Sequence, residues 1–160
     1  MTERIIGTMR RLDDGAGAVR VEDLYDTDID DLWSALTRPE RLARWIAVVE
    51  GDLRLGGVFR ARFTSEWEGP MRVETCEEPY RLLLTGLEDG TQVEATLTAE
   101  GERTRLVVEE RGLPVDKLHY YGAGWQVHLE DLGHLLAGET SEWRPRWQEL
   151  TPAYLALPVG

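Results

Sequence analysis

The chain has 160 residues, which is enough for one domain with a substantial core and too few to expect two. Its 30 acidic residues outnumber its 18 basic ones, and the net charge of −12 argues against nucleic acid or an anionic membrane surface as a partner. The single cysteine, Cys76, excludes an intrachain disulfide and a multi-cysteine metal site, and it fits a reducing compartment. Because no signal peptide and no long apolar run is visible, we expect a cytoplasmic protein without membrane insertion.

The first third of the chain predicts a hairpin followed by two short helices. Residues 5–12 and 18–25 flank a turn-rich spacer of Asp and Gly, so they can pair as two strands. Thr27 or Asp28 can cap a helix that carries an apolar stripe from Ile29 to Leu36, and Pro39 ends it. A second short helix is expected over residues 40–46.

From residue 52 onward the apolar residues recur with the period of two that is typical of strands. Leu53 and Leu55 precede Gly56-Gly57 and a strand over 58–63, which together predict a bent hairpin. After Gly69-Pro70, further strands are expected over 71–75, 81–87, 92–98 and 104–111. This order of elements predicts an antiparallel α+β domain rather than a parallel α/β protein.

The segment 122–138 predicts an amphipathic helix late in the chain. Its apolar stripe, which begins before the segment, recurs at steps of three and four and consists of Leu118, Gly122, Trp125, Leu129, Leu132 and Leu136. The residues expected on the polar side are Lys117, Gln126, Glu130, Asp131 and His134. A long helix that lays one stripe on a curved sheet forms a receptacle, which favours a container for a small molecule.

Residues 141–160 carry several large apolar side chains, including Trp143, Trp147 and Tyr154. Leaving them in water would cost about 25 cal/mol per Å² of apolar surface, so we expect this Trp-rich arm to pack on the domain. A partner-binding or dimerising arm is the alternative. The expected organisation is a single domain over 1–140, with an N-terminal extension over 1–17 that forms a strand, and the C-terminal arm over 141–160.

Several separated motifs resemble one family. They are Tyr25-Asp26-Thr27, the run from Leu32-Trp33 through Pro39-Glu40 to Trp45, Leu55-Gly56-Gly57-Val58-Phe59, Pro79-Tyr80-Arg81-Leu82, and Gly124-Trp125 with His128-Leu129-Glu130-Asp131-Leu132. Their order resembles the START-like (SRPBCC) helix-grip superfamily, within it the branch named for the activator of heat-shock protein 90 ATPase. The resemblance implies a curved antiparallel sheet of about seven strands wrapped around a long C-terminal helix, two short helices after the first family strand, and a cavity between sheet and helix.

The aromatic residues are the main candidates for a binding site, because apolar ligand pockets combine aromatic walls with a few polar tips. We expect the ligand-binding residues to be Trp45, Phe59, Phe63, Trp67, Met71, Tyr121, Trp125, His128 and Leu129. Gly122 and Gly124 beside Trp125 indicate close approach of another element, or room for something bulky.

Candidates for catalysis are few. Asp23 and Glu110 share the inward side of their strands with apolar residues, and in the resembled fold these two strands are neighbours. Two carboxyls in a partly dry cavity would have raised pKa values and could do acid–base chemistry together with His128. The alternative is that both acids lie solvated or paired with arginines. Cys76 lies beside Glu77 and Glu78, which would raise the pKa of its thiol, so we expect it to be inert.

The residues therefore predict binding of a small hydrophobic or amphipathic molecule rather than catalysis. A polyketide aromatase or cyclase that uses the inward acids, and a chaperone-associated interaction domain, are the two alternatives that the resemblance leaves open. No cofactor and no metal ion is expected, since no ligand cluster is visible. We expect a monomer or a homodimer whose partner is a small hydrophobic ligand.

Overall fold

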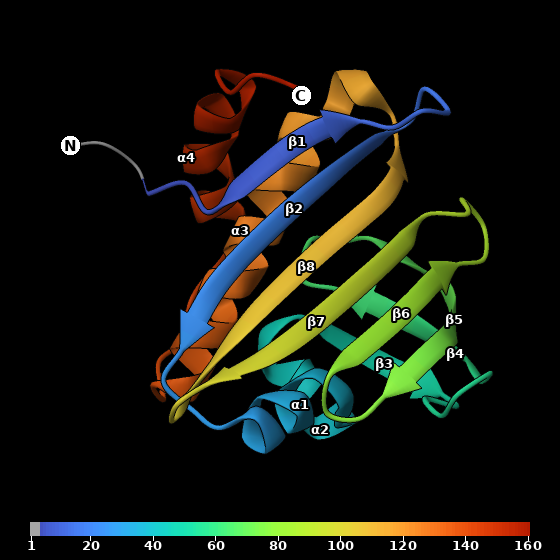
Figure 1. The fold of residues 1–160 in the computed structure, drawn as a ribbon, viewed down its shortest axis with the longest axis vertical. Helices are drawn as coiled ribbons and strands as arrows, with labels where there is room; N and C mark the ends of the chain where they lie inside the picture. The colour runs from blue at the N-terminus through green and yellow to red at the C-terminus, as the bar shows by residue number, and fades with distance from the viewer. Residues whose placement is uncertain (1–3) are drawn as a thin grey trace.

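The structure is a computed structural model that describes residues 4–160. An eight-stranded antiparallel sheet curves around a long helix, in the strand order β1-β2-β8-β7-β6-β5-β4-β3 (Figure 1). Residues 1–3 of the expected N-terminal extension lie outside the described residues. The strands are β1 (Gly7–Arg11), β2 (Gly17–Tyr25), β3 (Ala47–Gly51), β4 (Val58–Phe63), β5 (Glu68–Glu77), β6 (Arg81–Gly86), β7 (Gln92–Glu100) and β8 (Arg103–Leu113).

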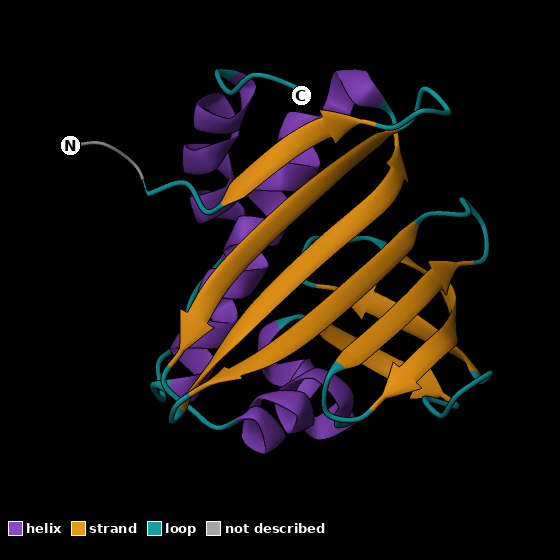
Figure 2. Cartoon of the chain, in the orientation of Figure 1, coloured by secondary structure: helices purple, strands orange, loops and turns teal. Residues whose placement is uncertain are grey.

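The helices divide the inner face of the sheet between them (Figure 2). The long helix α3 packs on β1 and β2, whereas α1 and α2 contact β3, β7 and β8. The core lies between these helices and the sheet. None of the helices within residues 4–160 is long and apolar enough to cross a membrane. The helical elements are α1 (Ile29–Thr37), α2 (Pro39–Trp45), the 3-10 turn η1 (Val115–Lys117), α3 (Leu118–Leu136) and α4 (Trp143–Leu155).

The fold predicted from the sequence is confirmed, and several local signals account for it. The turn-rich spacer joins β1 to β2, which pair as an antiparallel hairpin. Asp28 caps α1, since its Oδ1 accepts a hydrogen bond of 2.8 Å from the backbone N–H of Asp31. Pro39 is the first residue of α2, a position that tolerates proline because its N–H would have no partner within the helix. β1 adds the eighth strand to the seven that the resemblance implies.

Two details of the middle of the chain differ from the expectation. The strand expected around Leu53 and Leu55 lies earlier, at β3, and Leu55 is exposed in the turn that follows. Gly69 and Pro70, which precede the strand expected over 71–75, lie inside β5. Pro70 is tolerated there because its carbonyl still accepts a hydrogen bond from the backbone N–H of Leu87, although it can donate none.

The helix α4 covers the side of α3 that the sequence marks as polar. Gln126, expected on the solvated face, is fully buried, and its Oε1 accepts hydrogen bonds from the hydroxyl of Tyr154 at 2.7 Å and the backbone N–H of Ile6 at 3.2 Å. Gly122 permits this contact, since a Cβ there would lie 2.6 Å from Cδ1 of Tyr154. Part of the polar side of α3 is therefore an internal interface, where the segment before β1 and the helix α4 provide hydrogen-bond partners for Gln126.

Candidate functional site

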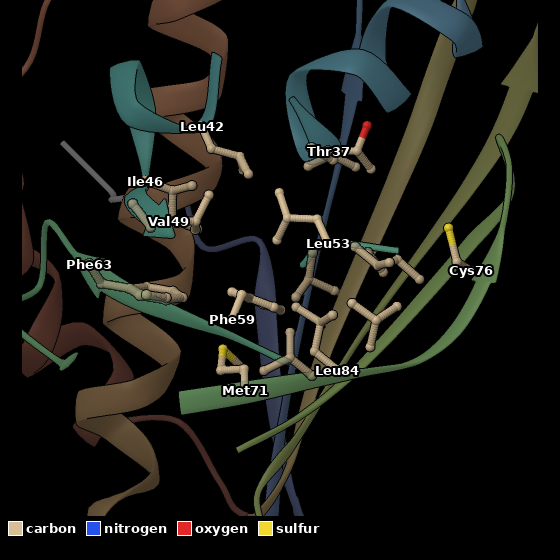
Figure 3. A pocket seen from close by; sticks show the side chains of 18 of the residues that line it. Thr37, Leu42, Ile46, Val49, Leu53, Phe59, Phe63, Met71, Cys76 and Leu84 are labelled. Atoms are coloured by element: carbon tan, nitrogen blue, oxygen red, sulfur yellow. The ribbon is translucent and has the colours of Figure 1, made fainter. Parts of the chain in front are cut away.

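A cavity of about 150 Å³ lies between α1 and α2 and the inner face of the sheet (Figure 3). We name it the inner compartment. Its walls are apolar apart from the hydroxyl of Thr37, the thiol of Cys76 and the indole N–H groups of its tryptophans, so it offers a ligand mainly dispersion contacts. The lining residues are Trp33, Leu36, Thr37, Leu42, Trp45, Ile46, Ala47, Val49, Leu53, Phe59, Ala61, Phe63, Met71, Val73, Cys76, Leu82, Leu84, Val93, Ala95, Val108 and Trp125.

A second cavity of about 370 Å³ adjoins the first beside α3. This outer compartment combines aromatic walls with several polar side chains, and exposed residues form its rim. The lining residues are Phe63, Ser65, Glu66, Trp67, Met71, Asp89, Thr91, Val93, Glu110, Leu113, Tyr121, Gly124, Trp125, His128 and Trp143.

Four side chains line both compartments and separate them: Phe63, Met71, Val93 and Trp125. The indole Nε1–H of Trp125 donates a hydrogen bond of 2.8 Å to Oε1 of Glu110, which fixes how the indole lies between α3 and β8. The partition between the two compartments therefore consists of side chains.

Glu110 is the principal ionisable group of the outer compartment. Its pKa is raised to about 7, mainly by burial and in part by repulsion from Asp89, while the hydrogen bond from Trp125 opposes the shift. No lysine or arginine is among the residues that line this compartment. Near neutral pH this carboxyl therefore exchanges between its protonated and ionised forms inside a cavity that supplies no counter-charge.

His128 lies in an aromatic cage formed by Phe63, Trp125 and Trp143, whose ring centroids are 5.3 to 5.8 Å from its own. Its Nδ1 is buried and has no hydrogen-bond partner within residues 4–160. Burial lowers the pKa of the imidazole to about 3, so the ring is neutral at physiological pH. A neutral imidazole always carries one nitrogen that accepts a hydrogen bond, and here that capacity is unused by the protein.

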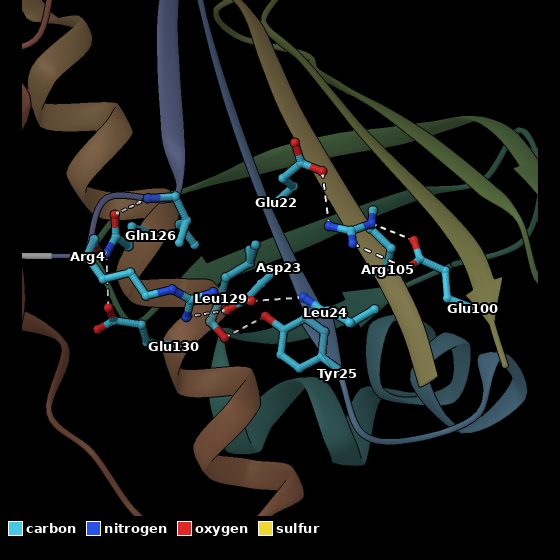
Figure 4. A network of polar contacts seen from close by, with 11 residues as sticks. Arg4, Glu22, Asp23, Leu24, Tyr25, Glu100, Arg105, Gln126, Leu129 and Glu130 are labelled. Atoms are coloured by element: carbon cyan, nitrogen blue, oxygen red, sulfur yellow. Dashed lines mark hydrogen bonds and ion pairs between the residues drawn. The ribbon is translucent and has the colours of Figure 1, made fainter. Parts of the chain in front are cut away.

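The expected pairing of Asp23 with Glu110 is wrong. Their strands are neighbours, but Asp23 lies opposite Leu106 and Glu110 lies opposite Val19, so the two acids are about 13 Å apart along the ladder. Asp23 instead accepts hydrogen bonds of 2.8 and 3.3 Å from the guanidinium of Arg4, as Figure 4 shows. The pattern of alternation identified the inward face correctly but carried no information on how the strands are offset.

The structure distributes the expected ligand-binding residues over the two compartments. Trp45 and Phe59 line the inner one, whereas Trp67, Tyr121 and His128 line the outer one. Phe63, Met71 and Trp125 form part of the partition. Leu129 lines neither; it is fully buried, and its backbone carbonyl accepts a hydrogen bond of 2.7 Å from the hydroxyl of Tyr25 (Figure 4).

Sequence reasoning missed several residues of the outer compartment, among them Asp89, Thr91 and Trp143. Asp89 and Thr91 lie in and after a tight turn, and nothing in their spacing relates them to Glu110 on β8. Trp143 belongs to the C-terminal arm, and it reaches the compartment because α4 packs on α3. The aromatic richness of that arm was the one available signal.

Cys76 lines the inner compartment, and burial together with the nearby charge of Glu78 raises the pKa of its thiol. A thiol with a raised pKa is a poor nucleophile at neutral pH. Within residues 4–160, no three His, Cys, Asp or Glu side chains are grouped so that they could hold a metal ion.

Comparison with solved structures places the chain among helix-grip proteins. The crystal structure of CalU16 from Micromonospora echinospora is 31% identical, with a TM-score of 0.79 over 98% of each chain. DynU16, a protein of the dynemicin biosynthetic locus, is 29% identical with a TM-score of 0.69, over 78% of this chain and 49% of its own. EF2215 from Enterococcus faecalis, a conserved protein of unknown function, shares the fold at 20% identity, with a TM-score of 0.76 over 93% of this chain and 88% of its own.

A search of curated proteins gives no match. The sequence model of the family "Activator of Hsp90 ATPase homolog 1-like protein" matches residues 26–137. This region extends from the end of β2 to the end of α3, and it contains most residues of both compartments. The chain therefore belongs to the family of activator of Hsp90 ATPase homolog 1-like proteins, within the START-like superfamily.

Proposed function

We propose that the protein binds a small molecule whose apolar part fills the inner compartment and whose polar part lies in the outer one. The observation that carries this proposal is the pair of adjoining cavities inside one small domain, separated only by side chains. The outer cavity alone is within the range of about 300–1,000 Å³ that is usual for ligand sites.

The size and chemistry of the inner compartment limit the apolar part. A dry apolar cavity of about 150 Å³ holds a group the size of a benzene ring. Filling it would recover the dispersion contacts that its lining residues lack. DynU16 is encoded in the dynemicin biosynthetic locus, which supports a role connected with a small molecule.

The experiment is titration of the protein with an apolar fluorescent probe, together with native mass spectrometry of the freshly purified protein. We expect saturable binding with quenching of tryptophan emission. Ala95→Leu, which adds bulk to the wall of the inner compartment, should weaken binding without loss of the fold. Tyr80→Ala is the matched control, because Tyr80 is exposed and lines neither compartment. Equal affinity in all three proteins would contradict the proposal.

A second candidate function, acid–base catalysis of the aromatase or cyclase kind, is favoured by one observation. Glu110 has a pKa of about 7 in a cavity, which suits a group that accepts and returns a proton at neutral pH. Asp23 takes no part in this candidate, because Arg4 holds it outside both compartments. A ligand recovered from the native protein distinguishes the candidates: an enzyme converts it and Glu110→Gln does not, whereas a binding protein returns it unchanged.

A further inference from the structure

The outer compartment contains two carboxyls that no basic side chain neutralises. Glu110 accepts its hydrogen bond from Trp125, and Asp89 accepts from the backbone N–H and the hydroxyl of Thr91, at 3.0 and 2.9 Å. The negative charge of Asp89 adds to the cost of ionising Glu110, since it contributes to the raised pKa of that carboxyl. A third carboxyl at the rim, Glu66, is already paired with Arg144 of α4.

Other carboxylates of this sheet have arginine partners. Glu94 is paired with Arg81 and Arg111, and Glu109 is paired with Arg10 and Arg111. The fold thus supplies guanidinium groups on the outer face of the sheet, while the lining of the cavity contains none. None of the described residues that line the compartment brings a positive charge to Glu110 and Asp89, which leaves that place to a ligand.

The aromatic residues that line the outer compartment also favour a positive charge. Trp67, Tyr121, Trp125 and Trp143 present aromatic rings to the compartment, and a cation over such a ring is attracted by its quadrupole. The neutral imidazole of His128 is more than nine-tenths buried and has an unpartnered Nδ1. An N–H group that enters the compartment can therefore find carboxylate acceptors as well as ring faces.

We propose that the outer compartment selects ligands that carry a protonated amine, held by Glu110 and Asp89 among the aromatic rings, with the apolar body of the ligand in the inner compartment. This inference depends on the proposed function, and it names the chemical class that the site prefers. An alcohol of the same shape would lose the charge interaction, and a carboxylate would be repelled.

Ionisation of Glu110 makes this selection depend on pH. The other titratable groups that face it are Asp89 in the β6–β7 turn, Glu66 in the β4–β5 turn, and Tyr121 and His128 on α3. His128 is neutral because burial lowers its pKa to about 3, and burial raises the pKa of Tyr121, so neither changes charge between about pH 6 and 8. An alkyl amine is protonated throughout that range. Preference for the amine should therefore grow from pH 6 to pH 8 as Glu110 ionises.

Three matched probes test the proposal: phenylbutylamine, phenylbutanol and phenylbutyrate, which share a benzene ring and differ in the polar group. Their affinities are measured by displacement of the fluorescent probe at about pH 8. We expect the amine to bind about tenfold more tightly than the alcohol, and the carboxylate to bind most weakly. At about pH 6 the ratio between amine and alcohol should fall severalfold.

Substitutions locate the effect. Glu110→Gln and Asp89→Asn should each reduce the ratio between amine and alcohol, and the first should also remove its pH dependence. Glu102→Gln is the matched control, because it removes the same charge in the β7–β8 turn at the far end of these strands. Thermal melts of each variant verify that it is folded.

The outcomes separate the inference from the proposed function. If the apolar probe binds but the alcohol binds as tightly as the amine, the proposed selection of amines is wrong, while the proposed binding of a small molecule still holds. If neither the apolar probe nor any of the three compounds binds, both are wrong. An amine preference that Glu102→Gln reduces as much as Glu110→Gln would also overturn the assignment, since it would reflect net charge alone.

Discussion

Glu109 and Glu110 are adjacent on β8, yet they lie on opposite faces of the sheet and in opposite electrostatic environments. Burial alone would raise the pKa of Glu109, but hydrogen bonds from Arg10 and Arg111 bring it below its ordinary value. Burial raises the pKa of Glu110 to about 7, and no arginine opposes it. One strand thus presents a neutralised carboxylate to the outside and an unneutralised carboxyl to the cavity.

The difference shows how structural and functional acids can be told apart in this fold. The acids of the outer face form a network with arginines that the sheet itself positions, as with Glu22, Arg105 and Glu100 in Figure 4. Such exposed pairs contribute little to stability individually. An ionised acid without a cationic partner inside a cavity is unfavourable for the free protein. This arrangement is expected of a group whose cationic partner belongs to a ligand.

Among substitutions on the cavity side of the sheet, we expect Trp125→Ala to lower stability most. Removing a buried tryptophan costs about 3–5 kcal/mol, and here it also joins the two compartments and removes the hydrogen-bond donor of Glu110. We expect the melting temperature to fall by about 10 °C and the apolar probe to bind more weakly. Trp125→Phe keeps most of the packing, so it should isolate the loss of the hydrogen bond and raise the pKa of Glu110 further. Unchanged probe affinity in both variants would remove Trp125 from the site.

His128→Leu should make the protein more resistant to acid. Folding holds the pKa of His128 at about 3, below an unfolded value of about 6.5, so its contribution to stability is present above pH 6.5 and is lost as the pH falls toward 3. Leucine cannot take up this proton, and the imidazole has no hydrogen bond to lose. Relative to the wild type, the variant should gain about 2 kcal/mol at about pH 5, as measured by urea denaturation. If the free energy of unfolding fell in the same way with decreasing pH in both proteins, His128 would be solvated.

Glu110→Gln should stabilise the free protein at alkaline pH while weakening amine binding. The pKa of Glu110 is higher in the folded than in the unfolded state, so its contribution is favourable below about pH 4.5 and is lost as the pH rises to about 7. Glutamine keeps the acceptor for Trp125 without the charge. We expect a gain of about 3 kcal/mol at about pH 8 and none near pH 4, read from melts across that range. A destabilised variant at pH 8 would mean that Glu110 has a cationic partner.

Glu109→Gln should give a smaller change of opposite sign. Glu109 has a lowered pKa, so its contribution is present above its unfolded pKa and is lost as the pH falls. Because its partners are partly exposed, we expect a loss of about 0.5–1 kcal/mol near neutral pH that decreases as salt is added. If both glutamate variants changed stability in the same direction at pH 8, the contrast between the two faces would be wrong.

Much of the fold could be predicted from the sequence because its signals are local. The period of two in the sheet, the cap at Asp28 and the stripe on α3 each depend on neighbouring residues. The position of β3 was missed because the apolar pair Leu53 and Leu55 mimics a strand within a turn. The buried polar side of α3 was missed because α4, distant in the sequence, supplies the hydrogen bonds that make burial of Gln126 possible.

The site was predicted less completely, for a related reason. Alternation along β8 placed Glu110 inward, but the partner assigned to it, Asp23, was wrong, because the offset between strands depends on hydrogen bonds that a single sequence does not encode locally. Asp89 and Trp143 reach the outer compartment through a turn and through the packing of α4. Aromatic content therefore indicated a binding site, whereas its polar chemistry became visible only in three dimensions.

The most direct measurement is a pH titration of the indole N–H resonance of Trp125 by NMR, with and without saturating phenylbutylamine. This N–H donates to Glu110, so it reports the charge on that carboxyl, while the indoles of Trp45 and Trp147, bonded to backbone carbonyls, serve as internal controls. We predict a midpoint of about 7 in the free protein, and a midpoint about one unit lower with the amine bound, which linkage requires when the amine binds the ionised carboxyl about tenfold more tightly than the protonated one. A midpoint below about 5 in the free protein, or one that the amine leaves unchanged, would contradict the account.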